Sequence, residues 1–180
     1  MAFMSHKSPP KIDIRHAAQL SLQLSGDDVL LNYQRIMQET RGLGAENVLK
    51  WLVHAQTHHI QTDHQSVWLH VTVATTLPLA CQRCLENVDV DVQIDRDFRF
   101  VGNETKAEQE DGASEEDVLV LSLAFDLLAL IEDEILMGMP LIPRHDICPV
   151  DVKMTVADLA FESTHESPNP FAALSQLQTN

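Results

Sequence analysis

Two cysteines separated by two residues are the most chemically suggestive feature of this sequence. Cys81 and Cys84 lie in the segment LPLACQRCLENVDVDVQI, between two runs in which apolar and polar residues alternate. A Cys-x-x-Cys pair in a turn directs both sulfurs toward one point, and it is typical of half of a structural zinc site. A tetrahedral site needs two more ligands, and His145 and Cys148 offer them in the motif RHDIC. The four residues together predict a zinc site with three thiolates and one imidazole.

This metal site would join parts of the chain that lie far apart in the sequence. It would close a loop of about sixty residues, and metal binding could offset the entropy of that closure. Two other interpretations stay open. The cysteines could be partly buried thiols without a metal, with His145 on a loop. They could also form a redox dithiol, although thioredoxin-type motifs begin a helix, where the dipole lowers the thiol pKa, whereas this motif precedes a predicted strand.

The cellular location follows from simple features of the chain. The first residues, MAFMSHKSPPKIDIRH, contain no apolar segment that resembles a signal peptide. No run of about 18 apolar residues indicates a membrane span. We therefore expect a cytoplasmic protein, in which three cysteines are more consistent with thiols or metal ligands than with disulfides.

The net charge of −15 limits the choice of binding partner. Proteins that bind nucleic acid directly usually carry a basic patch, because phosphate neutralisation supplies much of the affinity. A field this acidic repels a polyanion and suits a basic partner protein. The charge could also serve solubility alone.

Alternating residues predict an antiparallel sheet in the middle of the chain. In the run 65–80, Val67, Leu69, Val71 and Val73 point to one face, and polar residues point to the other. The segments 46–60 and 88–95 form its neighbours, and the second extends toward residue 101. Weaker strands are predicted at 20–25, before a turn at Gly26-Asp27, and at 118–121.

Helices and loops complete the predicted architecture. Asp126 is a good N-cap for a main helix at about 126–138, which Pro140 stops. Short peripheral helices are expected near 29–44 and 170–177. The segment 103–117 has the composition of a mobile acidic loop, and residues 1–11 that of a flexible tail. The prediction is therefore an α+β fold, an antiparallel meander or partly closed sheet in a single domain over 12–178.

Two groups of acidic residues are candidate binding sites. Asp89, Asp91 and Asp95 share the outer face of the strand at 88–95, and Glu132, Asp133 and Glu134 lie on the main helix. Consecutive helical residues diverge, so the last three cannot all converge on one ligand. Because no P-loop, dinucleotide fingerprint or Gly-x-Ser-x-Gly motif is present in the sequence, we do not expect an enzyme.

The order of three motifs resembles the YceD family, the large ribosomal RNA subunit accumulation proteins. The motifs are CQRCLE at 81–86, EDEILMGMPLIPRHDIC at 132–148 and SPNPFAALSQL at 167–177. The resemblance covers roughly 12–178 and implies a role in synthesis, processing or stability of 23S ribosomal RNA. Many relatives carry further cysteines after the Pro-x-x-Pro segment, whereas this chain has only Cys148 there, which counts against zinc.

Three functions are compatible with the resemblance and the charge. The first is a ribosome biogenesis factor that binds a basic large-subunit protein or a pre-ribosomal particle through the two acidic groups. The second is a module that binds rRNA directly, through Arg83 on a zinc-stiffened Cys loop. The third is an RNA-processing enzyme that uses the helix carboxylates Glu132 and Asp133.

Overall fold

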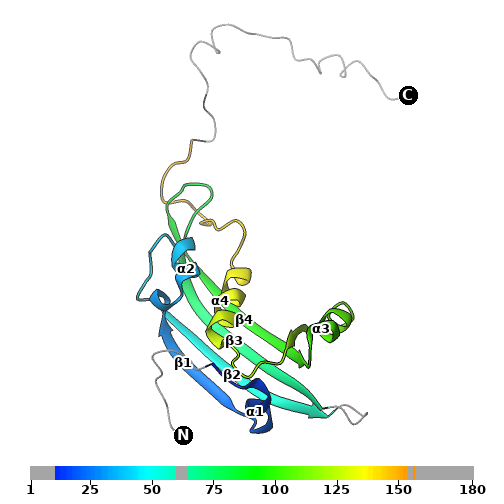
Figure 1. The fold of residues 1–180 in the computed structure, drawn as a ribbon. Helices are drawn as coiled ribbons and strands as arrows, with labels where there is room; N and C mark the ends of the chain where they lie inside the picture. Colours follow the sequence, from blue (N-terminus) through cyan, green and yellow to red (C-terminus); the bar gives the residue numbers. More distant parts are fainter. Residues whose placement is uncertain (1–10, 60–64, 154–155, 157–180) are drawn as a thin grey trace, which may run out of the picture.

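Five strands form one open sheet, and the chain visits them in spatial order (Figure 1). The computed structural model describes residues 11–59, 65–153 and 156. The first four strands pair antiparallel, and the last pairs parallel to the fourth. The strands are β1 (Gln23–Val29), β2 (Val48–His59), β3 (Gln65–Ala80), β4 (Asn87–Val101) and β5 (Asp117–Val120).

The predicted α+β class is confirmed, with two differences in the sheet. The sheet is open, not partly closed, and β5 is parallel to its neighbour. The parallel pairing follows from the connection, since the chain leaves β4, passes through a helix and returns in the same direction. The structure contains the helices α1 (Ile14–Gln19), η1 (Leu30–Asn32), α2 (Gln34–Glu39), α3 (Glu104–Asp111) and α4 (Leu127–Gly138).

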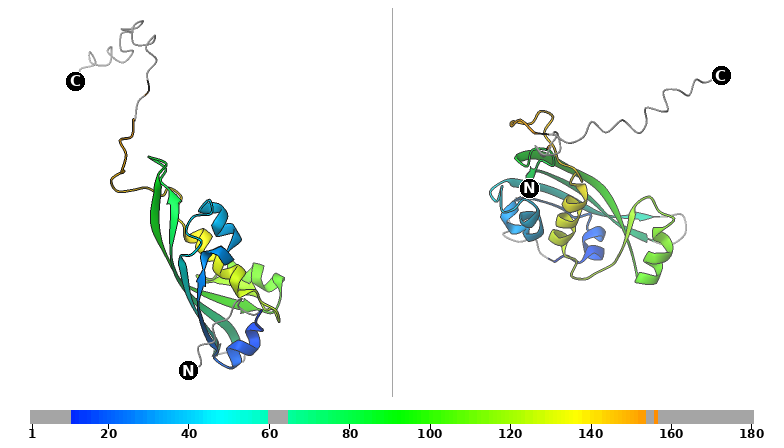
Figure 2. Two further views of the ribbon diagram at one scale, coloured as in Figure 1. Left: turned by 90° about the vertical axis from the view of Figure 1, so that its left-hand side faces the viewer. Right: turned by 90° about the horizontal axis from the view of Figure 1, so that it is seen from above.

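The main core lies between one face of the sheet and the helices α1, α2 and α4 (Figure 2). The inward residues of β3 are buried, as the alternation predicts, and Leu69 and Val71 are fully inaccessible. Ile131 and Ile135 of α4 pack against them. Helix α4 begins where predicted, because the Asp126 side chain accepts a hydrogen bond of 3.1 Å from the Ala129 backbone N–H. The other face of β2, β3 and β4 carries polar residues and no part of this helix layer.

The predicted turn at Gly26-Asp27 is wrong, because both residues lie inside β1. Gly26 is needed there for packing. It faces Trp51 on β2, and a Cβ atom at this position would lie 2.6 Å from Cζ2 of the indole. The strand also begins later than expected, since α1 occupies residues 14–19.

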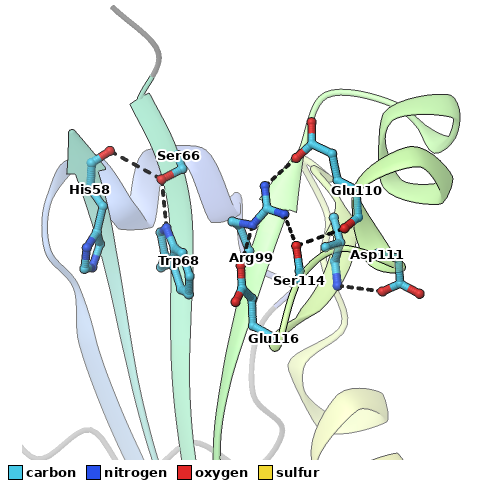
Figure 3. A network of polar contacts seen from close by, with 9 residues as sticks. His58, Ser66, Trp68, Arg99, Glu110, Asp111, Ser114 and Glu116 are labelled. Atoms are coloured by element: carbon cyan, nitrogen blue, oxygen red, sulfur yellow. Dashed lines mark hydrogen bonds and ion pairs between the residues drawn. The ribbon is translucent and has the colours of Figure 1, made fainter. Parts of the chain in front are cut away.

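The acidic segment 103–117 contains helix α3, where a mobile loop was predicted. Asn103 caps the helix by accepting a hydrogen bond of 2.9 Å from the Lys106 backbone N–H. Arg99 of β4 then binds Glu110, Glu116 and Ser114, so a cation from the sheet compensates part of the acidic charge (Figure 3).

The limits of the domain stay a prediction. The expected N-terminal tail, apart from Lys11, and the expected helix at 170–177 lie outside the described residues. Within the described part of the chain, no helix has the length and apolar character needed to cross a membrane.

Candidate metal centre

The four predicted metal ligands come together at one end of the sheet. Cys81 and Cys84 lie in the bend between β3 and β4, and the chain that follows α4 crosses to this bend (Figure 1). A backbone hydrogen bond of 2.8 Å from Gln82 N–H to the Pro143 carbonyl joins the two segments. This contact places His145 and Cys148 opposite the Cys-x-x-Cys pair.

The distances within the cluster fit a tetrahedral metal site. One ligand atom from each of the four residues lies within 4.8 Å of all the others. The sulfurs of Cys81 and Cys148 are 4.0 Å apart, and Cys84 Sγ is 3.4 Å from His145 Nδ1. A zinc ion with Zn–S bonds of about 2.3 Å places its sulfur ligands about 3.8 Å apart. The three cysteines are free thiols, so this group could hold a metal.

The bend is shaped to present the sulfur of Cys81. The Cys81 N–H donates to the Glu86 carbonyl and the Leu85 N–H to the Cys81 carbonyl, both at 2.9 Å, and Leu85 adopts a left-handed φ of 66°. Burial alone would raise the pKa of the Cys81 thiol. Backbone hydrogen bonds from Cys84, His145 and Arg83 outweigh burial and lower this pKa to about 5. A thiolate is the form of cysteine that binds metals.

The imidazole of His145 is oriented by a backbone carbonyl. Its Nε2 lies 3.0 Å from the Asn87 carbonyl oxygen, which can only accept a hydrogen bond. Nε2 therefore carries the proton, and the lone pair of Nδ1 faces the sulfurs. Such a carbonyl partner is common for metal-binding histidines, because it fixes both the tautomer and the ring orientation.

Arg83 lies between Cys81 and Cys84 in the sequence, and its side chain extends to the loop that carries His145 and Cys148. Its Nε donates to Cys148 Sγ at 3.0 Å, and its Nη2 donates to the carbonyls of His145 and Asp146 at 2.8 and 3.2 Å. The guanidinium thus connects the bend with the loop that carries the other two ligands.

The predicted strand acids face solvent on the side of the sheet away from α4. Asp89, Asp91 and Asp95 are exposed residues of β4, and Asp97 continues the same row. Asp91 accepts a hydrogen bond of 2.7 Å from Thr76 Oγ1 on β3. Asp95 and Asp97 lie 3.5 and 2.9 Å from the two ring nitrogens of His70, also on β3. We call Asp89, Asp91, Asp95 and Asp97 the acidic row.

The three helix acids do not all converge on one group, as predicted, and each has a partner within the molecule. Glu132 accepts hydrogen bonds of 2.8 and 2.9 Å from the backbone N–H and Nε of Arg35, and Asp133 also binds the Arg35 guanidinium. Glu134 is buried and lies 3.3 Å from Arg96 on β4. These acids therefore hold α4 to α2 and to the sheet. Their role in partner binding stays a prediction.

Sequence reasoning missed Arg35, Asn87 and Arg96. Each acts on a residue that lies at least 38 positions away in the chain, so no local spacing could reveal the contact. Arg83 was identified as a candidate RNA contact, and its sequence position gives no sign of the loop that it binds.

Comparison with known proteins assigns the chain to a family. A family model described as "Large ribosomal RNA subunit accumulation protein YceD" matches residues 69–178, which include all four candidate ligands. The chain belongs to the YceD family. A protein from Haemophilus influenzae with the same name is 30% identical over 138 residues, which cover 74% of this chain and 79% of the relative. No solved structure matches the chain. The family name describes involvement in accumulation of large-subunit ribosomal RNA and not an enzyme.

Proposed function

We propose that this protein is a ribosome biogenesis factor that supports 23S rRNA accumulation by binding a basic large-subunit protein or a pre-ribosomal particle. Such a factor would work in the cytoplasm, where these particles assemble. Family membership supports the ribosomal role. The observation that supports a basic partner is the acidic row, which lies exposed on a sheet face that α1, α2 and α4 leave uncovered.

The charge around the acidic row favours a protein partner over RNA. Four aspartates lie on the same face of a single strand, and their paired residues on β3 are Pro78, Thr76, Thr72 and His70. The nearby Arg99 already binds Glu110 and Glu116. Exposed acids steer and orient a basic partner, whereas phosphates would be repelled, as the net charge of −15 also implies.

We further propose that the metal centre binds zinc and serves as a structural staple. Three thiolates and an imidazole form a closed donor set of the type that structural zinc sites use, with no position left for substrate. The centre would fix the start of β4, because the Asn87 carbonyl that orients His145 belongs to the first residue of that strand. The acidic row begins two residues later.

The helix carboxylates give less support to an RNA-processing enzyme. Glu132 and Asp133 share the guanidinium of Arg35, and Glu134 is buried beside Arg96. In the described part of the chain, the cysteine–histidine cluster is the group of side chains whose geometry could hold a metal ion.

The proposal can be tested by neutralising three of the four aspartates of the acidic row without changing the fold. We expect the triple variant Asp89→Asn, Asp91→Asn, Asp95→Asn to lose salt-sensitive retention of basic large-subunit proteins from ribosomal extracts. The expected loss is roughly 0.5–3 kcal/mol, since each exposed ion pair contributes about 0.2–1 kcal/mol. The matched control is Glu46→Gln, Glu108→Gln, Glu115→Gln, which removes three exposed acids elsewhere.

Each result of this experiment separates the candidate functions. Equal weakening by both triple variants would mean that only net charge matters, which would contradict a binding face. If both triple variants still bind 23S rRNA in the absence of other proteins, the result would favour direct RNA recognition. Magnesium-dependent RNA cleavage that Glu132→Gln abolishes would favour an enzyme.

A further inference from the structure

We propose that Arg83 is a positioning residue of the metal centre, which holds the 145–148 loop in place and balances the charge of the thiolates. The sequence alone assigned Arg83 to RNA contact. The inference rests on the metal centre proposed above, and it concerns how the chain prepares this centre for the ion.

The contacts of Arg83 all go to one short loop. Its guanidinium donates to Cys148 Sγ and to the carbonyls of His145 and Asp146, at distances between 2.8 and 3.2 Å. The backbone hydrogen bond of Gln82 to Pro143, at 2.8 Å, and the hydrogen bond of His145 to the Asn87 carbonyl, at 3.0 Å, also connect this loop to the bend and to β4. Arg83 adds three further contacts, and they reach both ligand residues of the loop or their carbonyls. Arg83 therefore helps to bring His145 and Cys148 to the Cys-x-x-Cys pair before any metal binds.

The charge of Arg83 also matches the donor set. A divalent ion with three thiolates and a neutral imidazole carries a net charge of −1, in a protein whose net charge is already −15. One adjacent guanidinium brings the centre to neutrality. The guanidinium of arginine is always charged, so it can balance the charge of the centre at any physiological pH.

The geometry requires arginine and not merely a positive charge. Nε reaches the sulfur while Nη2 reaches two carbonyls, and only a planar, forked group can donate in both directions at once. Lysine would preserve the charge but lose the fork. Hydrogen bonds to a coordinating sulfur also change its electron donation to the metal, so the contact should have a spectroscopic signature.

The test compares Arg83→Gln and Arg83→Lys with Arg144→Gln in the full-length chain. Arg144 is an exposed cation directly before His145, so its variant makes the same charge change beside the same ligand loop. Zinc affinity is measured by competition with a chelator, and Co²⁺ is added to the metal-free proteins to record the thiolate-to-metal charge-transfer band. Circular dichroism checks that each variant is folded. If Arg83→Gln does not fold, Arg83→Lys serves as the informative variant.

Loss of an outer contact to metal ligands typically lowers affinity by about 10- to 100-fold, which we expect for Arg83→Gln. Arg83→Lys should recover part of the loss, Arg144→Gln should match the wild type, and the Co²⁺ band should shift in both Arg83 variants. Wild-type affinity and spectrum in folded Arg83 variants would overturn the inference while leaving the metal centre intact. An equal loss in Arg144→Gln would also overturn it. Failure of the wild type to bind either metal would overturn the metal centre itself.

Discussion

Among single residues, Glu134 makes the stability of the protein depend on pH. Its side chain is only 3% exposed, and burial raises its pKa although Arg96 opposes the shift. The folded state therefore holds this proton more tightly than the unfolded state does. As a result, the contribution of Glu134 is most favourable below the unfolded pKa of about 4.3, and it decreases as the pH rises through the higher folded pKa.

Glu134→Gln should remove this dependence, because the amide does not ionise. We expect the free energy of unfolding of the variant, relative to wild type, to increase between pH 4 and pH 7 in urea titrations. The exposed residue Glu108 provides a control, and Glu108→Gln should follow the wild-type curve. A constant difference between Glu134→Gln and wild type over this range would show that Glu134 is not desolvated as the structure implies.

Residue types at short spacing could be predicted well, and their distant partners could not. The proximity of the three cysteines and His145 was predicted from Cys-x-x-Cys and His-x-x-Cys, because both motifs are local and the donor chemistry is restrictive. The divergence of Glu132 and Glu134 followed from helical geometry. Which cation each acid meets depends on how α2 and β4 pack against α4, and Arg35 and Arg96 carry no local sign of that packing.

At the scale of elements, α3 is a small unit that polar contacts attach to the sheet. Its apolar contribution is modest, since Ala107 belongs to a small cluster with Val101, Val118 and Val120. Arg99, whose side chain is 12% exposed, binds Glu116, Glu110 and Ser114 around it (Figure 3). One guanidinium thus makes three side-chain contacts to this segment, beside the hydrogen bond of 3.3 Å from the Val118 backbone N–H to Asp111.

Arg99→Gln should release α3 without unfolding the main sheet. Hydrogen bonds to charged groups contribute about 1.5–3 kcal/mol, so the local opening free energy of residues 104–120 should fall by at least that order. Amide hydrogen exchange measures this change directly, with β2 and β3 as internal references. Lys106→Gln, an exposed substitution on the same helix, should have no effect. Equal loss of protection in β3 would mean that α3 belongs to the main cooperative unit.

The helix α3 could not be predicted from the pattern of apolar residues. Alternation of apolar residues predicted β2, β3 and β4, because one face of each is buried against the same core. The segment 103–117 has almost no apolar residues, so composition favoured a loop. The helix is stabilised there by a cap and by Arg99 from a neighbouring strand, and only the second contact requires the folded sheet.

At the scale of the whole molecule, the candidate metal centre lies directly before the strand that carries the acidic row. The bend that holds Cys81 and Cys84 leads directly into β4, where Asn87 orients His145 and Asp89 begins the row. The loop that carries His145 and Cys148 follows α4. Acidic side chains of α4 form ion pairs with Arg35 of α2 and Arg96 of β4. A metal at this position would therefore connect the end of the helix layer to the strand that carries the proposed binding surface.

The last prediction concerns this connection, and it is the measurement to make first. Protein purified without added zinc should contain about one zinc per chain. Chelation should lower the free energy of unfolding, because metal binding is linked to folding. The size of the effect should increase with the ratio of the free Zn²⁺ concentration to the dissociation constant of the site. Cys84→Ser should lose the metal and show the lower stability without chelator, and chelator should then have no further effect. Purified protein that contains no metal and has three titratable thiols would contradict a structural zinc site. The acidic row would then be the remaining candidate site.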